Sequence, residues 1–166
     1  MMSLSAMLRM CTAVVVALAL LMPLAAQDRF AVELTRYQQE TDPVRKARAL
    51  AKLGDDQIAL ARKQLKDGED VASLQTLEQY RDEVQQTAAG LKATGADAEK
   101  KPAGFKELQI SLREIIRRID DLILTLPVDK RPFFREVRSD LAKTQNDLIG
   151  ALFPRRPDQN SRKTNP

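Results

Sequence analysis

Apolar residues recur along most of the chain at intervals of three and four, the spacing that places side chains on one face of an α-helix. The longest such run starts at Phe105 and ends at Leu126, where Pro127 prevents the helix from continuing. Its members are Phe105, Leu108, Leu112, Ile115, Ile119, Leu122 and Leu126, reinforced by Ile116 and Ile123. The pattern predicts a helix over 105–126 that lies at the centre of the fold.

Two earlier runs predict a pair of helices joined by a tight turn. The first starts at Pro43, and the carboxylate of Asp42 is placed to accept hydrogen bonds from the free N–H groups of its first turn. Gly68 supplies the left-handed residue that ends a helix, and Asp70 is placed to cap the next one. The predicted buried face of that next helix consists of Val71, Leu74, Leu77, Val84, Ala88 and Leu91, with Tyr80 alongside. Because the turn is short, we expect an antiparallel αα-hairpin over 43–92.

The remaining predicted elements are a short first helix, a linker and a last helix. Apolar residues at i, i+4 and i+7 predict the first helix over 29–39. The segment 93–103 is small and charged, which predicts an exposed linker. Asp129 is a candidate cap for the last helix, which completes a second hairpin over 104–153. Its stripe is Phe134, Val137, Leu141, Thr144, Leu148 and Ala151, flanked by Phe133, Ile149, Leu152 and Phe153.

These elements predict an all-α fold: an antiparallel helical bundle built from two αα-hairpins plus a short N-terminal helix. One domain over 27–153 is the simplest arrangement, because about twenty large apolar side chains at about 1.5 to 3 kcal/mol each suffice for a core. The alternative is two hairpins that are hinged at the linker and paired through a dimer. Intramolecular bundles and coiled coils share this spacing, so the sequence leaves both arrangements open.

Small residues dominate one face of the predicted helix that starts at Pro43. Ala51, Gly54 and Ala61 lie on this face, where they would let a neighbouring helix approach closely. A glycine inside a helix costs about 1 kcal/mol relative to alanine, so Gly54 predicts a close helix crossing that requires it. The alternative is a kink, with Gly54 ending one short helix and the aspartates after it capping another.

The N-terminus has the features of an export signal. Arg9 precedes an uncharged apolar run, Met10 to Leu24, and small residues follow at Ala25 and Ala26. The run has about 15 residues, fewer than the about 20 that a helix needs to cross the hydrocarbon of a bilayer. We therefore predict a signal peptide over 1–26 and a secreted or periplasmic protein. A retained signal anchor is the alternative.

Charge changes this picture only at the C-terminus. The chain has 27 Lys and Arg against 23 Asp and Glu, but 27–153 holds 22 of each. The excess lies in 154–166, which is polar and unpatterned and predicts a disordered tail. A neutral folded part lacks the basic face that nucleic-acid binding requires. The tail instead predicts a weak contact with an anionic envelope surface through Arg155, Arg156, Arg162 and Lys163.

Composition removes most catalytic chemistry. The chain has no His, and its one Cys, Cys11, lies in the predicted signal. We therefore predict no catalytic, cofactor or metal site in the mature protein. Two pairs of adjacent carboxylates are the candidates for acid–base work: Asp55 with Asp56, and Asp120 with Asp121. Adjacent residues on a helix point about 100° apart, so we expect ordinary surface ion pairs instead, such as Arg117 with Asp121 and Glu114 with Arg118.

Two segments are similar to known families. Leu34-Thr35-Arg36-Tyr37-Gln38 matches L-T-x-x-Q and resembles the signature of small periplasmic all-α chaperones of the Spy and CpxP type. That resemblance implies a concave helical dimer that cradles unfolded clients, although the family usually carries two copies and this chain has one. The segment from Leu60 to Tyr80, with Gly68 at its turn, resembles a tetratricopeptide unit and implies an interaction module.

The sequence therefore predicts an exported, non-enzymatic helical protein, a scaffold or adaptor that binds another macromolecule in the cell envelope. A protein partner is expected, and a homodimer is consistent with the spacing. A periplasmic chaperone and a tetratricopeptide-like module are the alternatives.

Overall fold

The computed structural model describes residues 24–154, with side chains from Arg29 onward. This part of the chain is helical apart from its connections, which confirms the all-α class. Most of the predicted signal, 1–23, and nearly all of the predicted tail, 155–166, lie outside the described residues. The helices are α2 (Leu24–Gln39), α3 (Pro43–Lys66), α4 (Asp70–Ala93), α5 (Phe105–Thr125) and α6 (Arg131–Leu152).

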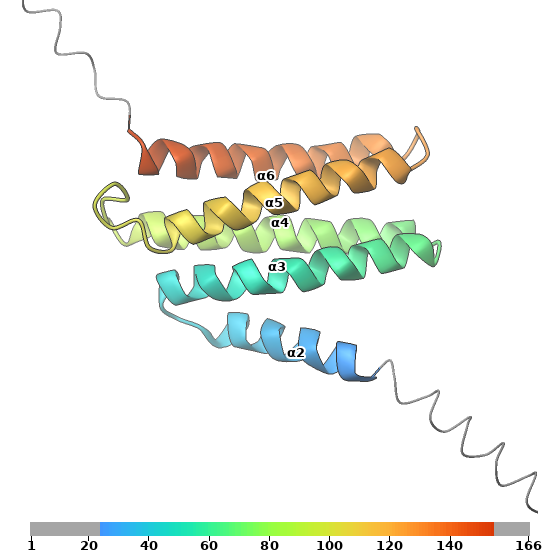
Figure 1. Cartoon of the computed structure of the whole chain (residues 1–166), viewed down its shortest axis with the longest axis horizontal. Helices are drawn as coiled ribbons and strands as arrows, with labels where there is room; N and C mark the ends of the chain where they lie inside the picture. Colours follow the sequence, from blue (N-terminus) through green and yellow to red (C-terminus); the bar gives the residue numbers. More distant parts are fainter. Residues whose placement is uncertain (1–23, 155–166) are drawn as a thin grey trace, which may run out of the picture.

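Four long helices lie side by side, and α2 packs on the outside of α3 (Figure 1). α3 contacts α4 and α5, while α6 contacts α5 and α4. The α3–α4 and α5–α6 connections lie at one end of the bundle, which we call the turn end. The longer α4–α5 connection lies at the other end, together with the end of α6.

One hydrophobic core joins all of these helices. Its members come from α2, α3, α4, α5 and α6 and include the buried side chains of Tyr37, Leu53, Val84, Ile115 and Leu141. Because residues of both helix pairs belong to the same cluster, the pairs are not separate bodies in this structure. The partly buried residues at its edge include Phe30, the first apolar residue of the described side chains.

The start and the middle of α3 show how the local sequence sets the helix. Asp42 is its N-cap, and the Oδ1 atom of Asp42 accepts a 2.8 Å hydrogen bond from the N–H of Arg45. Pro43 occupies the first turn, as predicted. The helix continues without a break through Gly54, so the alternative of a kink there is wrong.

Two predicted caps are wrong. α4 begins at Asp70 itself, with Glu69 as N-cap, and the Asp70 carboxylate pairs with Lys130 from the α5–α6 connection. α6 begins at Arg131 with Lys130 as N-cap and no side-chain cap, so Asp129 does not cap it. A short-range pattern cannot predict either result, because the partner of Asp70 is 60 residues away in the sequence.

The predicted start of the first helix and the predicted exposure of the linker both need adjustment. α2 begins at Leu24, five residues before the predicted start, because Leu24 to Asp28 contain no helix breaker. The expected cleavage after Ala26 thus falls in its first turn. The linker is not wholly exposed, since Ala98 is buried in the core. Gly104, with φ +83°, packs against α3 and α4: a Cβ there would lie 2.7 Å from Leu91 Cδ2.

Ion pairs connect the helices along the sides of the bundle. Arg48 to Glu107, at 3.1 Å, and Arg118 to Asp55, at 2.6 Å, join α3 to α5. Lys92 to Asp147, at 3.3 Å, and Arg81 to Asp140, at 3.7 Å, join α4 to α6. Each exposed pair contributes about 1 kcal/mol or less to the stability, so these pairs bear more on how the helices align than on the free energy of unfolding.

Candidate functional site

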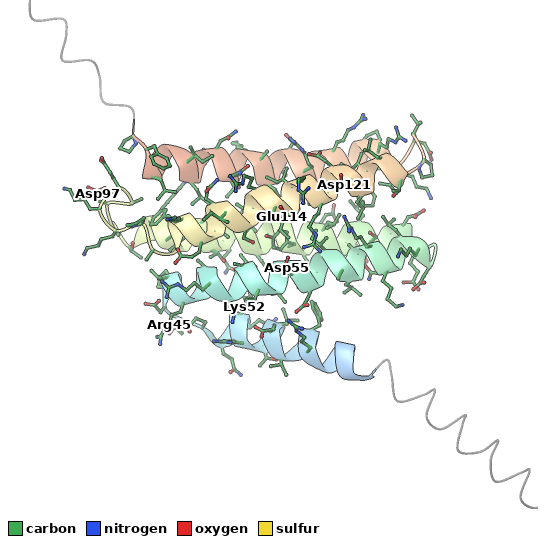
Figure 2. The ribbon with its side chains drawn as sticks, in the orientation of Figure 1. Arg45, Lys52, Asp55, Asp97, Glu114 and Asp121 are labelled. Carbon is green, nitrogen blue, oxygen red and sulfur yellow. The ribbon has the colours of Figure 1, made fainter. Side chains whose placement is uncertain are left out.

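One carboxylate of each adjacent pair is engaged in an ion pair between helices. Asp55 pairs with Arg118, and Asp120 accepts two hydrogen bonds from Arg138, at 2.9 and 3.0 Å. Figure 2 labels Asp55 on α3 and Asp121 farther along α5 toward the turn end. Among the residues with described placement, no group of three or more His, Cys, Asp or Glu side chains is arranged to hold a metal ion.

Two arginines pair with other carboxylates than the expected ones. Arg117 donates to Glu114 at 2.7 Å, one turn earlier on α5, instead of pairing with Asp121. Arg118 reaches across to α3 and does not pair with Glu114. Helical spacing alone allows either arginine to pair with Glu114. Because Asp55 of α3 lies within reach of Arg118, Arg117 is the one that does.

Gly54 lies close to the side chain of a residue on α4. A Cβ at Gly54 would lie 2.9 Å from Cε2 of Tyr80, so the ring fills the space that the glycine leaves. The Ala61 carbonyl, also buried on this face, accepts a 2.9 Å hydrogen bond from Ser73 of α4. Ala51 is half-buried. Gly54 and Ala61 thus fit α3 to α4.

The hydroxyl of Tyr80 is buried between α3, α4 and α5. Burial raises the pKa of Tyr80 above its usual value. Ser111 lies close enough to lower that pKa in part, but it is not in hydrogen-bonding geometry, and the Tyr80 hydroxyl has no partner among the described residues. An isolated buried hydroxyl with a raised pKa is a poor acid or base at neutral pH, so we assign it no chemical role.

Large apolar side chains gather at the turn end of the bundle. Val71 is 72 % exposed, Leu124 72 %, Val128 75 % and Phe133 58 %. They come from the first turns of α4 and α6, the last turn of α5 and the α5–α6 connection. We call these four residues the turn-end surface. They are the candidate functional site, because exposed apolar clusters mark contact surfaces.

Two grooves flank this surface. One is lined by α4 and α6 residues that include Val71, Leu74 and Phe133. The other lies between α3 and the end of α5 and includes Leu65 and Leu126. Both grooves contain Asp70.

Charge at the turn end is balanced. The two segments 63–71 and 124–133 carry four basic and four acidic residues. Among them, Lys63 pairs with Asp67 at 2.6 Å, and Lys130 pairs with Asp70. The charges carried by the segments that hold these four residues therefore cancel, which favours an apolar contact over an electrostatic one.

Sequence reasoning assigned two of these residues to the core. Val71 was predicted on the buried face of its helix, but it lies in the first turn of α4, at the end of the bundle. Phe133 and Phe153 were also expected to be buried, and both are exposed. The next residue in the chain, Phe134, points into the core instead.

Comparison of the chain with models of protein families, with curated proteins and with solved structures finds no match. None of the helices within 24–154 is long and apolar enough to cross a membrane. The predicted anionic contacts Arg155, Arg156, Arg162 and Lys163 lie outside the described residues. The turn-end surface is thus the site on which a functional proposal can be built.

Proposed function

We propose that the protein is an exported, non-enzymatic scaffold or adaptor that binds another macromolecule in the cell envelope and contacts the envelope through its turn end. In this proposal the bundle consists of two αα-hairpins with a short N-terminal helix, and the protein is secreted or periplasmic. The observation that carries the proposal is the turn-end surface, on a molecule whose sides are joined by ion pairs.

The physical support is the cost of leaving these side chains in water. Full burial of a valine, leucine or phenylalanine contributes about 1.5 to 3 kcal/mol, and none of the four is needed for the core. The core is complete without them, so a partner that covered them would gain apolar burial without disturbing the bundle. Burial of these side chains against a partner would give a specific contact, and it requires no catalytic group.

A matched pair of variants tests the contact. Val128→Ser with Phe133→Ser removes half of the turn-end surface, while Val32→Ser with Phe153→Ser removes one exposed valine and one exposed phenylalanine elsewhere. We expect the wild-type chain and the second variant in the envelope fraction of cells, and the first variant in the soluble exported fraction. Equal fractionation of the two variants would contradict the proposal, as would a wild-type chain retained in the cytoplasm.

The scaffold role needs a separate measurement. One defined protein should copurify with the wild-type chain from solubilised envelope. If nothing copurifies under conditions that preserve the fold, the adaptor part of the proposal fails.

The chaperone alternative is favoured by one observation, the same apolar surface, because unfolded chains bind exposed apolar residues. Its motif lies in α2, where Leu34 is half-buried against the core and Thr35 donates to the Ala31 carbonyl at 2.8 Å. A chaperone should slow the aggregation of an unfolded client at or below equimolar ratio. No protection at any ratio would remove this alternative.

The tetratricopeptide-like alternative concerns shape, with Gly68 at φ +80° in the turn.

A further inference from the structure

We infer that α2 is a detachable helix: it separates from the bundle as one unit, moving about the connection 40–42, while α3 to α6 stay folded. Separation frees the groups of α4 that the Tyr37 side chain contacts when α2 is docked. Four observations carry the inference: which helices α2 contacts, how it is held, which buried polar atoms lack a partner, and how α3 begins. The turn-end surface has no part in it, so its test is independent of the proposed function.

The first observation is that α2 packs on one long helix only. It lies on the outer side of α3, and its backbone does not approach α4, α5 or α6 (Figure 1). Each long helix, in contrast, packs on at least two others. Ion pairs join α3 to α5 and α4 to α6, but none of the pairs between helices involves a described side chain of α2. Separation of α2 therefore disrupts a single helix–helix interface.

The second observation is that one residue, Tyr37, holds α2 in place. Among the described side chains of α2, only Tyr37 belongs to the buried core, while Phe30 and Leu34 are partly buried at its edge. The Tyr37 hydroxyl donates to the carbonyl of Glu83, at 3.2 Å, and lies 3.0 Å from the hydroxyl oxygen of Thr87. Both partners are on α4. The attachment of α2 to the second helix of this pair thus depends on one hydroxyl group.

The third observation is that the polar groups around this contact are incompletely paired. Gln57, buried on α3, donates through Nε2 to Oε2 of Glu83 at 2.9 Å. Its Oε1 atom and the Oε2 atom of Glu33, on α2, are buried and have no hydrogen-bond partner among the described residues. A buried polar atom without a partner destabilises the structure that buries it. Because the Glu33 carboxylate returns to water when α2 separates, separation recovers part of that cost.

The fourth observation is that α3 begins without help from α2. The N-terminus of α3 is capped by Asp42, which accepts a 2.8 Å hydrogen bond from the N–H of Arg45. Pro43, in the first turn, has no N–H with which to continue the hydrogen bonds of a preceding helix. These contacts are all made within 42–45. The start of α3 therefore stays intact when α2 moves away.

The experiment is native-state hydrogen exchange on the chain from Gln27 onward, which keeps every residue in or against the described core, since all lie at Phe30 or later. The amides of Leu34 and Tyr37 report on α2, and the amide of Leu53 reports on the long helices. We expect Leu34 and Tyr37 to exchange with one common free energy, at least about tenfold faster than Leu53 after correction for intrinsic rates. Their exchange should also depend less on denaturant, because separation exposes little surface.

Three variants identify the opening. Ile119→Val leaves a small cavity in α5, which α2 does not contact, so exchange at Leu53 should rise about fivefold while exchange at Leu34 stays unchanged. Tyr37→Phe should raise exchange at Leu34 about fivefold, because the hydrogen bonds of the docked state are lost. Tyr80→Phe is the matched control: it removes a buried hydroxyl that has no described partner, and it should leave exchange at Leu34 unchanged.

Each of three results would overturn the inference. Equal acceleration of Leu34 and Leu53 by Ile119→Val would show that α2 opens only when the whole bundle unfolds. Unchanged exchange at Leu34 in Tyr37→Phe would show that this hydroxyl does not hold the helix. A steady rise in free energy from Leu34 to Tyr37 would indicate fraying from the N-terminal end instead of separation as one unit. None of these results bears on the turn-end surface, so the proposed function would stand or fall by its own test.

Discussion

Gly54 leaves a space on α3 that the buried ring of Tyr80 fills. The small-residue face of α3 predicted a close helix crossing at Gly54, and an aromatic side chain lies in that space. It could not identify Tyr80 as the contact, because the pairing depends on how α3 and α4 are aligned. Similarly, Asp42 could be predicted as a cap from its neighbours, while the partner of Asp70 depended on a distant segment.

Gly54→Ala should lower the free energy of unfolding by about 1 kcal/mol. Overpacking against Tyr80 costs about 1 to 3 kcal/mol, which exceeds the gain of about 1 kcal/mol from helix propensity. Gly90→Ala is the matched control, since nothing lies within 4 Å of a Cβ there, and it should raise the stability by about 0.5 to 1 kcal/mol. Urea unfolding measures both, and an equal gain in the two variants would contradict the packing at Gly54.

The two tyrosines predict a loss of stability at alkaline pH. Burial raises the pKa of Tyr37 and of Tyr80, with Asp55 and Glu83 raising the pKa of Tyr80 further and Arg118 lowering it. A raised pKa means that the neutral form is favoured in the folded state, so the stability is intact below pH about 10 and falls as the unfolded tyrosines ionise above it. Tyr80→Phe should reduce this fall between pH 8 and 11. Lysines titrate in the same range in both proteins, so an identical fall in the variant would contradict the burial of Tyr80.

At the scale of elements, the start of α5 is fixed by a contact within the helix and by one with a neighbouring helix. Glu107, in the first turn of α5, accepts a 2.7 Å hydrogen bond from the N–H of Gly104 and pairs with Arg48 of α3. The bounds of α3, α5 and α6 could be predicted from spacing and prolines. The exposed residues at their ends could not be predicted, because periodicity identifies the buried face of a helix but not where the neighbouring helices end.

Glu107→Ala should lower the free energy of unfolding at pH 7 by about 1 kcal/mol through loss of this cap. Burial raises the pKa of Glu107, but the backbone N–H groups and Arg48 together lower it by more. The pKa of Glu107 is therefore below its usual value. The contribution is therefore present above pH about 4.5 and is lost as the pH falls below it. Glu114→Ala, which removes an exposed pair on the same helix, should change the stability by less than about 0.5 kcal/mol. Equal effects of the two substitutions on denaturant unfolding would refute the capping role.

At the scale of the whole molecule, one core holds the helices together and apolar side chains collect at one end. The sequence was sufficient for the class of fold and left open whether the two helix pairs share a core. Only the packing of α3 on α5 and of α4 on α6 answers that question, because helical spacing is the same in both arrangements. The turn-end surface also emerged only at this scale, since Val71 and Phe133 are more than 60 residues apart in the chain.

The claim of a single core is tested most directly by native-state hydrogen exchange on the chain from Gln27 onward. The account predicts that the amides of Leu53, Val84, Ile115 and Leu141, one from each long helix, exchange through the same global opening, with one free energy and one denaturant dependence. If Leu53 and Val84 exchanged at one free energy while Ile115 and Leu141 exchanged at another, the two helix pairs would unfold independently and the account would be contradicted.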